Sequence, residues 1–315
     1  MAGQVWSQNT LGGFFATNKL SKDIRHLGQA LQKFRQFTKV EQGYAKKSGE
    51  SMLVDIVSDV ADAGGSISET SKVPETRVTI SQVTVTANEY GQKIPYTGKL
   101  EDFSEISLDN HLSMALRDSM SKTLDAAAYA QFILGAYVFT PTGSVSTKTN
   151  TISSTGSAGT IATRHMSWED FEEISAYLSQ VLKAPLYDGE NYIGVINSYT
   201  RAAIRKDSDW KDAKHYGDPA ALFTGEVGKI GNVRCVEETY NLPNTLGTTT
   251  YRGSGIVFGR DAVAQVIAVA EELRSDPPTD LGRSKSIGWY ALLGYKLLWT
   301  STTAGEARTM RIHST

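Results

Sequence analysis

The feature that most constrains this chain is an uninterrupted helical pattern from Ser107 to Val138. Apolar residues recur along it at intervals of three and four, as on one face of an α-helix. This stripe comprises Leu108, Leu112, Ala115, Leu116, Met120, Ala127, Ala130, Ile133 and Leu134, and the opposite face carries Arg117, Asp118, Lys122 and Asp125. Ser107 suits the N-cap, and about 30 residues make a rod of roughly 45 Å. A long core helix of an ordinary α+β protein is one interpretation of this pattern. The flanking segments are needed to distinguish it from other folds.

The segment before the helix reads as extended chain. Residues 51–63 begin as a short alternating run and end at Gly64-Gly65, and a second extended stretch runs from Val73 to Tyr96. We expect residues 73–98 to form a β-hairpin with its turn at 88–91. A lone two-stranded ribbon is marginal in water. It should therefore lie on another surface, and a neighbouring subunit is one candidate.

Helices and short strands alternate after the long helix. Residues 140–166 are rich in Ser, Thr and Gly, which is typical of a mobile loop or a thin exposed hairpin. From Ser167, which opens a capping box, to about residue 270 the pattern indicates a mixed α/β domain. The elements expected there are helices at 167–181, 199–206 and 261–267, a helical turn at 218–219, and strands at 192–196, 233–236 and 256–258.

The last part of the chain predicts strands. Every odd residue from Ile287 to Trp299 is apolar, which gives one well-marked face. We expect that face, including Trp289 and Trp299, to pack on the long helix near Leu112 and Leu116. Residues 308–313 should pair back against this strand. The α/β domain would then be an insertion between the long helix and the returning strands.

The first fifty residues are basic and weakly periodic, although the net charge of the chain is -2. Four phenylalanines, at 14, 15, 34 and 37, are scattered along them. Such a segment can lie as an arm across a neighbour, or it can form the first helix of the main domain. Its basic residues are Lys19, Lys22, Arg25, Lys33, Arg35, Lys39, Lys46 and Lys47.

Motifs for catalysis are missing from the sequence. Cys235 is the single cysteine, which excludes an intrachain disulfide and a cysteine-based zinc site. The five histidines lack metal-ligand spacing, and phosphate-loop, nucleophile-elbow and dinucleotide-binding motifs do not occur. No signal peptide and no apolar run of membrane-spanning length is found. We therefore expect a protein that is not an enzyme, with no cofactor and no membrane partner.

The order of parts resembles the major capsid protein of tailed bacteriophages, whose fold is shared with herpesvirus capsids and encapsulin shells. The resemblance covers about residues 70–300. It is carried by three groups of motifs in order: Val73–Ile80 with Glu89–Gly91, Pro95–Gly98 and Glu101–Phe103; then Gly225–Ile230 with Arg234–Glu237; then Gly282–Trp289 with Tyr290.

The resemblance implies an α+β phage major-capsid fold with five parts. These are an N-terminal arm (1–50), a linker with a short strand (51–72), an extended β-ribbon loop (73–100), a peripheral domain (101–166 and 271–315) with spine helix 107–138, and an inserted α/β axial domain (167–270). Arg77, Lys93, Lys99, Glu101 and Asp102 are then expected at inter-subunit contacts. The basic residues Lys19, Lys22, Arg25, Lys33, Arg35 and Lys39 are expected to face packaged DNA or to make arm contacts.

The function implied is a shell subunit that self-assembles into pentamers and hexamers of an icosahedral head enclosing double-stranded DNA. Expected partners are a separate scaffolding protein, because only a short arm precedes Met52, a portal and decoration proteins. The location would be the virion, after assembly in the host bacterial cytoplasm. Two alternatives remain open: an encapsulin-like compartment shell, and a sequence-independent nucleic-acid-binding protein that works through residues 19–47.

Overall fold

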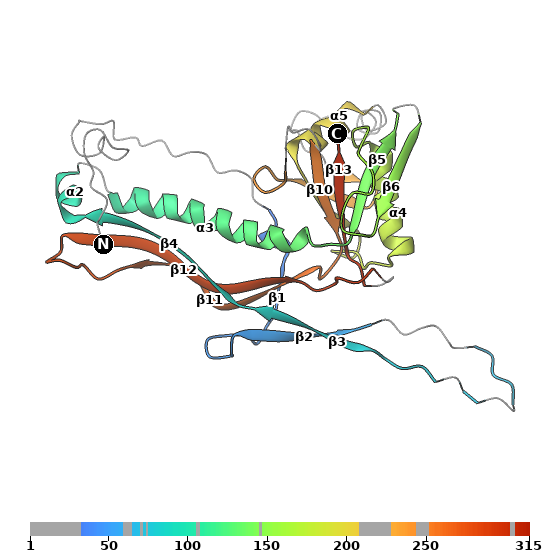
Figure 1. Cartoon of the computed structure of the whole chain (residues 1–315), viewed down its shortest axis with the longest axis horizontal. Helices are drawn as coiled ribbons and strands as arrows, with labels where there is room; N and C mark the ends of the chain where they lie inside the picture. Colours follow the sequence, from blue (N-terminus) through green and yellow to red (C-terminus); the bar gives the residue numbers. More distant parts are fainter. Residues whose placement is uncertain are drawn as a thin grey trace.

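The computed structural model describes residues 33–58, 65–69, 72–73, 75–104, 108–144, 147–207, 228–243, 252–302 and 306–315. These residues form two lobes that lie side by side (Figure 1). The elongated lobe is a long helix lying along a four-stranded sheet, and the compact lobe is built on a seven-stranded sheet. The mixture of helix and sheet confirms the predicted α+β class.

The sheet of the elongated lobe has the strand order β1-β11-β12-β4. Its members are β1 (Lys39–Val40), β4 (Asn88–Thr97), β11 (Val263–Ser275) and β12 (Ser284–Leu297), and the short helix α2 (Gly98–Phe103) follows β4. Strand β12 runs antiparallel to both β11 and β4. The odd residues of β12 from Trp289 to Leu297 are buried in one cluster with Leu116 and Leu124, which confirms the predicted strand and its apolar face.

The long helix is α3 (Leu108–Phe132), and it ends six residues before the predicted end. It contains no glycine or proline, which suits a helix of 25 residues. The chain leaves it at Gly135, where a Cβ atom would lie only 2.0 Å from Thr309 Oγ1. A close approach of the last strand therefore fixes the end of the helix. The predicted N-cap, Ser107, lies outside the described residues.

The buried face of α3 is rotated from the predicted stripe. Its fully buried apolar residues are Leu116, Leu124, Ala128 and Phe132, spaced by multiples of four. Ala115, Ala130 and Leu134 are exposed instead, whereas Asp125, which was expected on the solvent face, is buried. The pattern could not reveal that a second segment covers the back of the helix, and that segment is what buries Asp125.

A two-stranded ribbon of β2 (Ser51–Val57) and β3 (Ile80–Thr86) crosses the sheet on the face opposite α3 (Figure 1). This pairing corrects the predicted hairpin of residues 73–98. Strand β3 pairs antiparallel with β2, while β4 pairs with β12. Alternation indicated extended chain in this region, but the predicted turn at 88–91 is wrong, because these residues begin β4. It also could not give the pairing partners, since both options satisfy the same pattern.

Trp299 also departs from its predicted place. It lies just after β12 and packs with Ile56, Val85 and Leu298 in the cluster beneath the ribbon, not against α3. Its Nε1 donates to the backbone oxygen of Asp261 at 2.9 Å. Strand β12 ends at Leu297. The alternation of apolar residues continues to Trp299 in the sequence, but this side chain packs on the opposite face of the sheet.

The compact lobe has the strand order β6-β5-β13-β10-β7-β9-β8. Its strands are β5 (Tyr137–Gly143), β6 (Lys148–Ser153), β7 (Tyr192–Ile196), β8 (Lys229–Ile230), β9 (Val233–Glu237), β10 (Gly253–Phe258) and β13 (Thr309–Ser314). Strands β7 and β10 are buried along their whole length, as central strands covered on both faces should be. Helices α4 (Trp168–Ala176), η2 (Tyr177–Val181) and α5 (Ser198–Lys206) accompany the sheet, and the predicted capping box at Ser167 is present.

Two predicted elements of the C-terminal half are wrong. Residues 261–267 do not form a helix, because Val263 begins the long strand β11, and Asp261 adopts a left-handed φ of 54°. Residues 308–313 do not pair with β12, because β13 lies between β10 and β5 of the seven-stranded sheet. The compact lobe therefore draws on β5, β6 and β13 from outside residues 167–270. The predicted turn at 218–219 lies outside the described residues.

The two lobes share one apolar cluster. Phe132 of α3 contacts Phe258 of β10 with ring centroids 4.7 Å apart, and Phe34 contacts Phe132 at 5.6 Å. Phe34 is fully buried, so this part of the arm packs on its own chain. It precedes the single turn η1 (Arg35–Phe37). Residues 1–32, which carry most of the pattern for a first domain helix, lie outside the described residues.

Candidate assembly interface

The ribbon has two apolar faces, and only one of them is covered by its own chain. The inward face, with Met52, Val54 and Ile56, packs on the back of the sheet. On the other face Leu53, Val57 and Ile80 are each more than half exposed, and Val57 lies directly opposite Ile80. An exposed apolar face on a two-stranded ribbon is typical of a surface that contacts another molecule.

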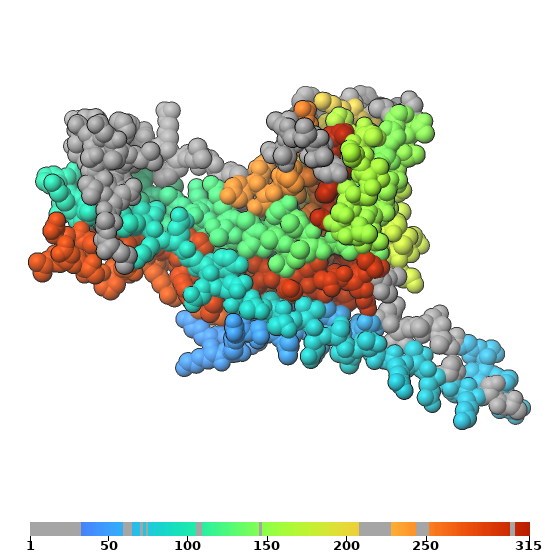
Figure 2. Space-filling view, in the orientation of Figure 1, coloured from blue at the N-terminus to red at the C-terminus, as the bar shows by residue number. Residues whose placement is uncertain are grey.

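The chain between β2 and β3 carries the exposed apolar surface further. Val73 and Val78 are more than half exposed, and Arg77 is exposed beside them. Figure 2 shows the cyan part of this segment extending well beyond the body of the molecule. Such a projection contributes little to the core of its own chain, so its contacts must come from elsewhere.

The other residues predicted at inter-subunit contacts are not on the ribbon. Lys93 lies on β4, where its Nζ contacts the Asp276 carboxylate at 3.0 Å and helps to lower the pKa of that group, after the hydrogen bond from Ser286. Glu101 accepts from Lys285 Nζ at 2.7 Å, which raises the pKa of Lys285. Lys93 and Glu101 are thus paired within one chain.

Lys99 and Asp102, also predicted at inter-subunit contacts, lie at the far tip of the elongated lobe. Lys99 and Asp102 are exposed on α2, and Phe103 at its end is 69% exposed. Leu281, in the turn between β11 and β12, is fully exposed and has a left-handed φ of 53°. Within the described residues Arg77 and Lys99 have no ion-pair partner, so these two remain available to another molecule.

The described part of the arm is held by its own chain. Arg35 Nη2 contacts Glu271 at 2.8 Å and lowers the pKa of that carboxyl, and Lys39 Nζ lies 3.4 Å from Asp261. Lys33 is half-buried. Lys19, Lys22 and Arg25 lie outside the described residues. Arg35 and Lys39 are therefore placed to dock the arm on its own chain.

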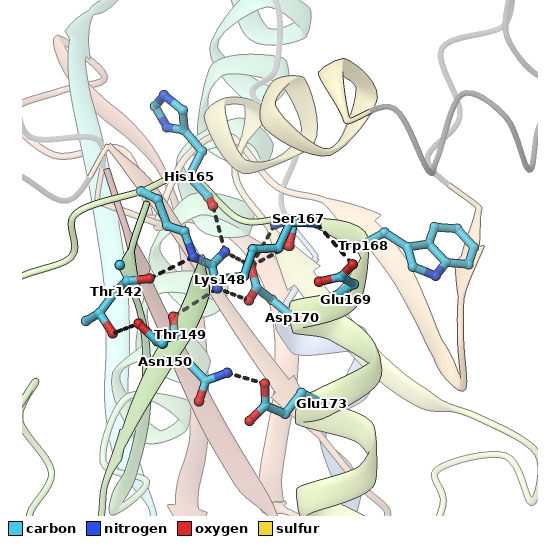
Figure 3. A network of polar contacts seen from close by, with 12 residues as sticks. Thr142, Lys148, Thr149, Asn150, His165, Ser167, Trp168, Glu169, Asp170 and Glu173 are labelled. Atoms are coloured by element: carbon cyan, nitrogen blue, oxygen red, sulfur yellow. Dashed lines mark hydrogen bonds and ion pairs between the residues drawn. The ribbon is translucent and has the colours of Figure 1, made fainter. Parts of the chain in front are cut away.

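A buried ion pair makes the outer edge of the compact lobe rigid. Arg164 Nη1 and Nη2 each lie 2.5 Å from an oxygen of Asp170, and both side chains are almost fully buried. Arg164 also donates to the backbone oxygens of Thr142 and Thr149, while Asp170 accepts from Ser167 (Figure 3). Two-pronged pairing with the remaining donors satisfied holds the β5–β6 hairpin against α4.

A second buried acidic group lies where the arm crosses α3. Asp125 accepts from the backbone of Arg35 at 2.9 Å and from Asn241 Nδ2 at 2.6 Å. Glu238 is fully buried and accepts three backbone N–H bonds from residues 240–242. Burial raises the pKa of both carboxyls, and the charge of Asp125 adds to the rise at Glu238.

The sequence pointed to few of these groups in advance. Apolar residues on both faces of 52–57 were the available signal that the ribbon has two apolar sides. The capping box located Asp170, but nothing in the sequence indicated that Arg164 would pair with it. Asp125 and Glu238 read as ordinary polar positions, because their burial depends on segments far away in the chain.

Few groups on the described surface are suited to chemistry. Burial raises the pKa of the Cys235 thiol to about 12, which leaves it a poor nucleophile. No cluster of three or more metal-ligating side chains occurs within the described residues. Among them, also, no helix is long and apolar enough to cross a membrane.

Three solved phage capsids have a fold similar to that of this chain. The cyanophage Pam1 capsid matches with a TM-score of 0.68 at 14% identity, over 97% of this chain and 98% of that chain. The capsid of Helicobacter pylori bacteriophage KHP30 gives 0.67 at 13% identity, over 98% and 97%. The capsid of Ralstonia phage GP4 gives 0.66 at 14% identity, over 100% and 99%. A search of curated protein sequences gives no match.

These likenesses define the class: the chain has the fold of a capsid shell protein. The sequence comparison then settles the family. The model of the phage capsid family matches residues 12–269, so the chain belongs to the phage capsid family. It is a major capsid protein, a structural component of the virion shell.

Proposed function

We propose that this protein assembles with copies of itself into the pentamers and hexamers of an icosahedral phage head that encloses double-stranded DNA. The observation that carries the proposal is the ribbon, with Leu53, Val57 and Ile80 exposed on its outward face. Interfaces between permanently associated subunits commonly bury about 2,000 Å² or more in total. A projecting ribbon supplies such area from a small chain.

In this proposal each lobe has its own role. The elongated lobe is the peripheral domain with α3 as its spine, and the compact lobe is the axial domain that meets its copies around the five-fold and six-fold axes. The strand pairing supports an axial domain that includes β5, β6 and β13 in addition to residues within 167–270. The projecting loop consists of β2, β3 and the chain between them, and it takes over the role first assigned to residues 73–100.

The predicted contacts divide accordingly. Arg77 on the ribbon and Lys99 and Asp102 on α2 are the residues we propose for contacts with neighbouring subunits. Lys93 and Glu101 act mainly within their own chain, as their ion pairs with Asp276 and Lys285 support.

The proposed partners are a scaffolding protein, a portal, decoration proteins and packaged DNA. The DNA is held without sequence preference by Lys19, Lys22 and Arg25, since basic residues neutralise phosphates whatever the sequence. Assembly takes place in the host cytoplasm, and the protein has no catalytic role.

The proposal can be tested by removing the projecting chain between β2 and β3 while keeping both strands and their contacts with the sheet. Ser58 and Thr79 are hydrogen-bonded next to the last strand pair, so replacing residues 59–78 by Asn-Gly closes β2 and β3 with a two-residue turn. We expect a folded subunit whose melting temperature is nearly unchanged and which forms no particles by electron microscopy. Normal particles from this variant would show that the projecting chain between β2 and β3 is not needed for assembly, and a large loss of stability would assign the segment to its own fold. The outward face of β2 and β3, which this variant keeps, is tested separately.

A pair of point variants provides the matched control. Leu53 and Asp55 lie on the same outward face of β2. Leu53→Asn removes apolar area and should reduce particle yield, whereas Asp55→Asn changes only a charge and should leave yield much closer to the parent. Equal yields from the two would show that the apolar face is not the contact.

A compartment shell related to encapsulins is the competing function. Its particles would enclose protein instead of nucleic acid. Nuclease-protected double-stranded DNA inside particles purified from infected cells supports the phage head, and particles filled with an enzyme would support the compartment.

A further inference from the structure

The arm is fastened to the molecule by a carboxylate that also binds a second, distant segment. Asp125, in the middle of α3, is only 3% exposed. Its Oδ1 accepts from the backbone N–H of Arg35 at 2.9 Å, and its Oδ2 accepts from Asn241 Nδ2 at 2.6 Å. The two donors are separated by about two hundred residues, so this side chain joins the arm to the loop that follows β9.

On the arm side, Asp125 acts as a helix cap. The turn η1 has no side-chain cap of its own, because its N-cap residue is Phe34. The backbone N–H groups of Lys33 and Phe34 also oppose the rise in the pKa of Asp125 that burial causes. The first N–H groups of a helical turn need acceptors from outside it, and here α3 supplies one. Phe34 is thereby held in the apolar cluster between the lobes.

On the loop side, a second carboxylate sets the position of Asn241. Glu238 Oε1 accepts from the backbone N–H of Tyr240 at 2.8 Å and of Asn241 at 2.7 Å, and Oε2 accepts from Leu242 at 3.0 Å. Lys122 of α3 lies 5.9 Å from the ring centroid of Tyr240, which adds a contact between helix and loop. The loop is thus folded around Glu238 and presents the Asn241 amide to Asp125.

The cost of burying a carboxylate makes these two contacts interdependent. A buried carboxylate is tolerated only when hydrogen bonds replace its lost water. If Asn241 withdraws, Oδ2 of Asp125 loses the hydrogen bond from the Asn241 amide, and the carboxylate is stabilised by turning toward water. Turning away would release the backbone N–H groups of the arm.

We propose that Asp125 is a joint that makes docking of the arm conditional on the loop at residues 238–243. While the loop is seated, Asn241 holds the Asp125 carboxylate in place to cap η1. When the loop is displaced, the cap from Asp125 weakens, and residues 33–38 open from α3 more often although nothing has touched them directly. A contact made on the compact lobe is thereby transmitted to the arm. The joint works within a single chain, so it stands or falls independently of the proposed shell assembly.

Hydrogen exchange in the full chain tests the joint. Asn241→Leu removes the donor while keeping the number and branching of the side-chain heavy atoms. The readout is the exchange of peptides covering residues 33–40, which lie far from Asn241 in the sequence. We expect exchange there to rise at least about tenfold, the effect of losing one hydrogen bond to a buried charge. Asn150→Leu is the matched control, since Asn150 also donates to a carboxylate, that of Glu173, in the compact lobe. It should leave arm exchange unchanged.

A double-variant cycle makes the outcome decisive. Asp125→Ala should free the arm by itself, and adding Asn241→Leu to it should then change arm exchange no further. Additive effects, or arm exchange in Asn241→Leu equal to the parent, would overturn the joint. If Asn241→Leu lowers the melting temperature of the whole chain, Asn241→Ser provides a milder loss of the same contact, and the same comparison applies.

Discussion

Trp289 offers the sharpest test of how the elongated lobe is built. Its side chain is only 3% exposed and lies in the apolar cluster that contains Leu116 and Leu124 of α3. Its Nε1 has no hydrogen-bond partner within the described residues. Trp289→Ala removes the indole and leaves a cavity, a change that typically costs about 3–5 kcal/mol. The unpaired donor already costs about 1–3 kcal/mol in the parent. We therefore expect a net loss near the lower end, about 3 kcal/mol.

Trp289→Phe separates these two contributions. Phenylalanine keeps most of the ring packing and removes the unpaired N–H, so we expect a loss below about 1.5 kcal/mol. Urea denaturation of the full chain, followed by circular dichroism, gives both free energies of unfolding. Trp299→Ala is the control, because Trp299 is half-buried on the opposite side of the sheet. If Trp289→Ala unfolds at the parent midpoint, or if Phe costs as much as Ala, the placement of this face against α3 is wrong.

Three further changes probe the other lobe, the pH dependence and the ribbon seat. Arg164→Met should cost about 3–5 kcal/mol in urea denaturation by leaving Asp170 buried and unpaired, and Asp170→Leu added to it should recover much of the loss. Burial lowers the pKa of His313 from 6.5 to about 4, so the unfolded chain binds the proton more readily than the folded chain. The free energy of unfolding should therefore fall by up to about 3 kcal/mol as the pH drops from 6.5 toward 4. His313→Gln should make the free energy of unfolding less dependent on pH in this range. Gly294→Ala would place a Cβ atom 2.1 Å from the backbone oxygen of Thr86. We expect a cost of about 1–3 kcal/mol in the free energy of unfolding and faster hydrogen exchange in β2 and β3. Unchanged exchange would mean that the ribbon does not pack against Gly294.

Local patterns predicted those elements whose environment the chain fixes by itself. The alternation at 287–299 gave strand β12, because one face of it meets α3 throughout. The capping box at Ser167 gave the start of α4, since both partners lie within four residues. The long helix was found for the same reason, although its end was set by Thr309 from the far end of the chain.

Pairing between distant segments was beyond such patterns. Residues 80–97 contain two strands, β3 and β4, which could pair with each other or with other strands. In the structure β3 pairs with β2 and β4 pairs with β12, and no local sequence pattern encodes that outcome. The run after Asp261 looked like a capped helix, yet its residues Ala264 and Val266 are needed beneath the ribbon. Asp125 is another case: its burial follows from Arg35 and Asn241, which lie far from it in sequence. The sequence therefore predicted that a ribbon forms the candidate interface. It did not predict that β2 and β3 make up this ribbon, or which of their residues are exposed.

The position of β13 in the middle of the seven-stranded sheet bears on how the protein matures on the ribosome. Until residues 309–314 leave the exit tunnel, β5 and β10 have no strand between them, and the sheet exists only as two separate pieces. The contacts that β13 makes with β5 span more than 170 residues, a long separation that slows folding. A nascent chain can thus expose its ribbon well before the compact lobe is finished. The compact lobe can therefore complete its sheet only after residues 309–314 have emerged, whereas all four strands of the elongated lobe precede them in the chain.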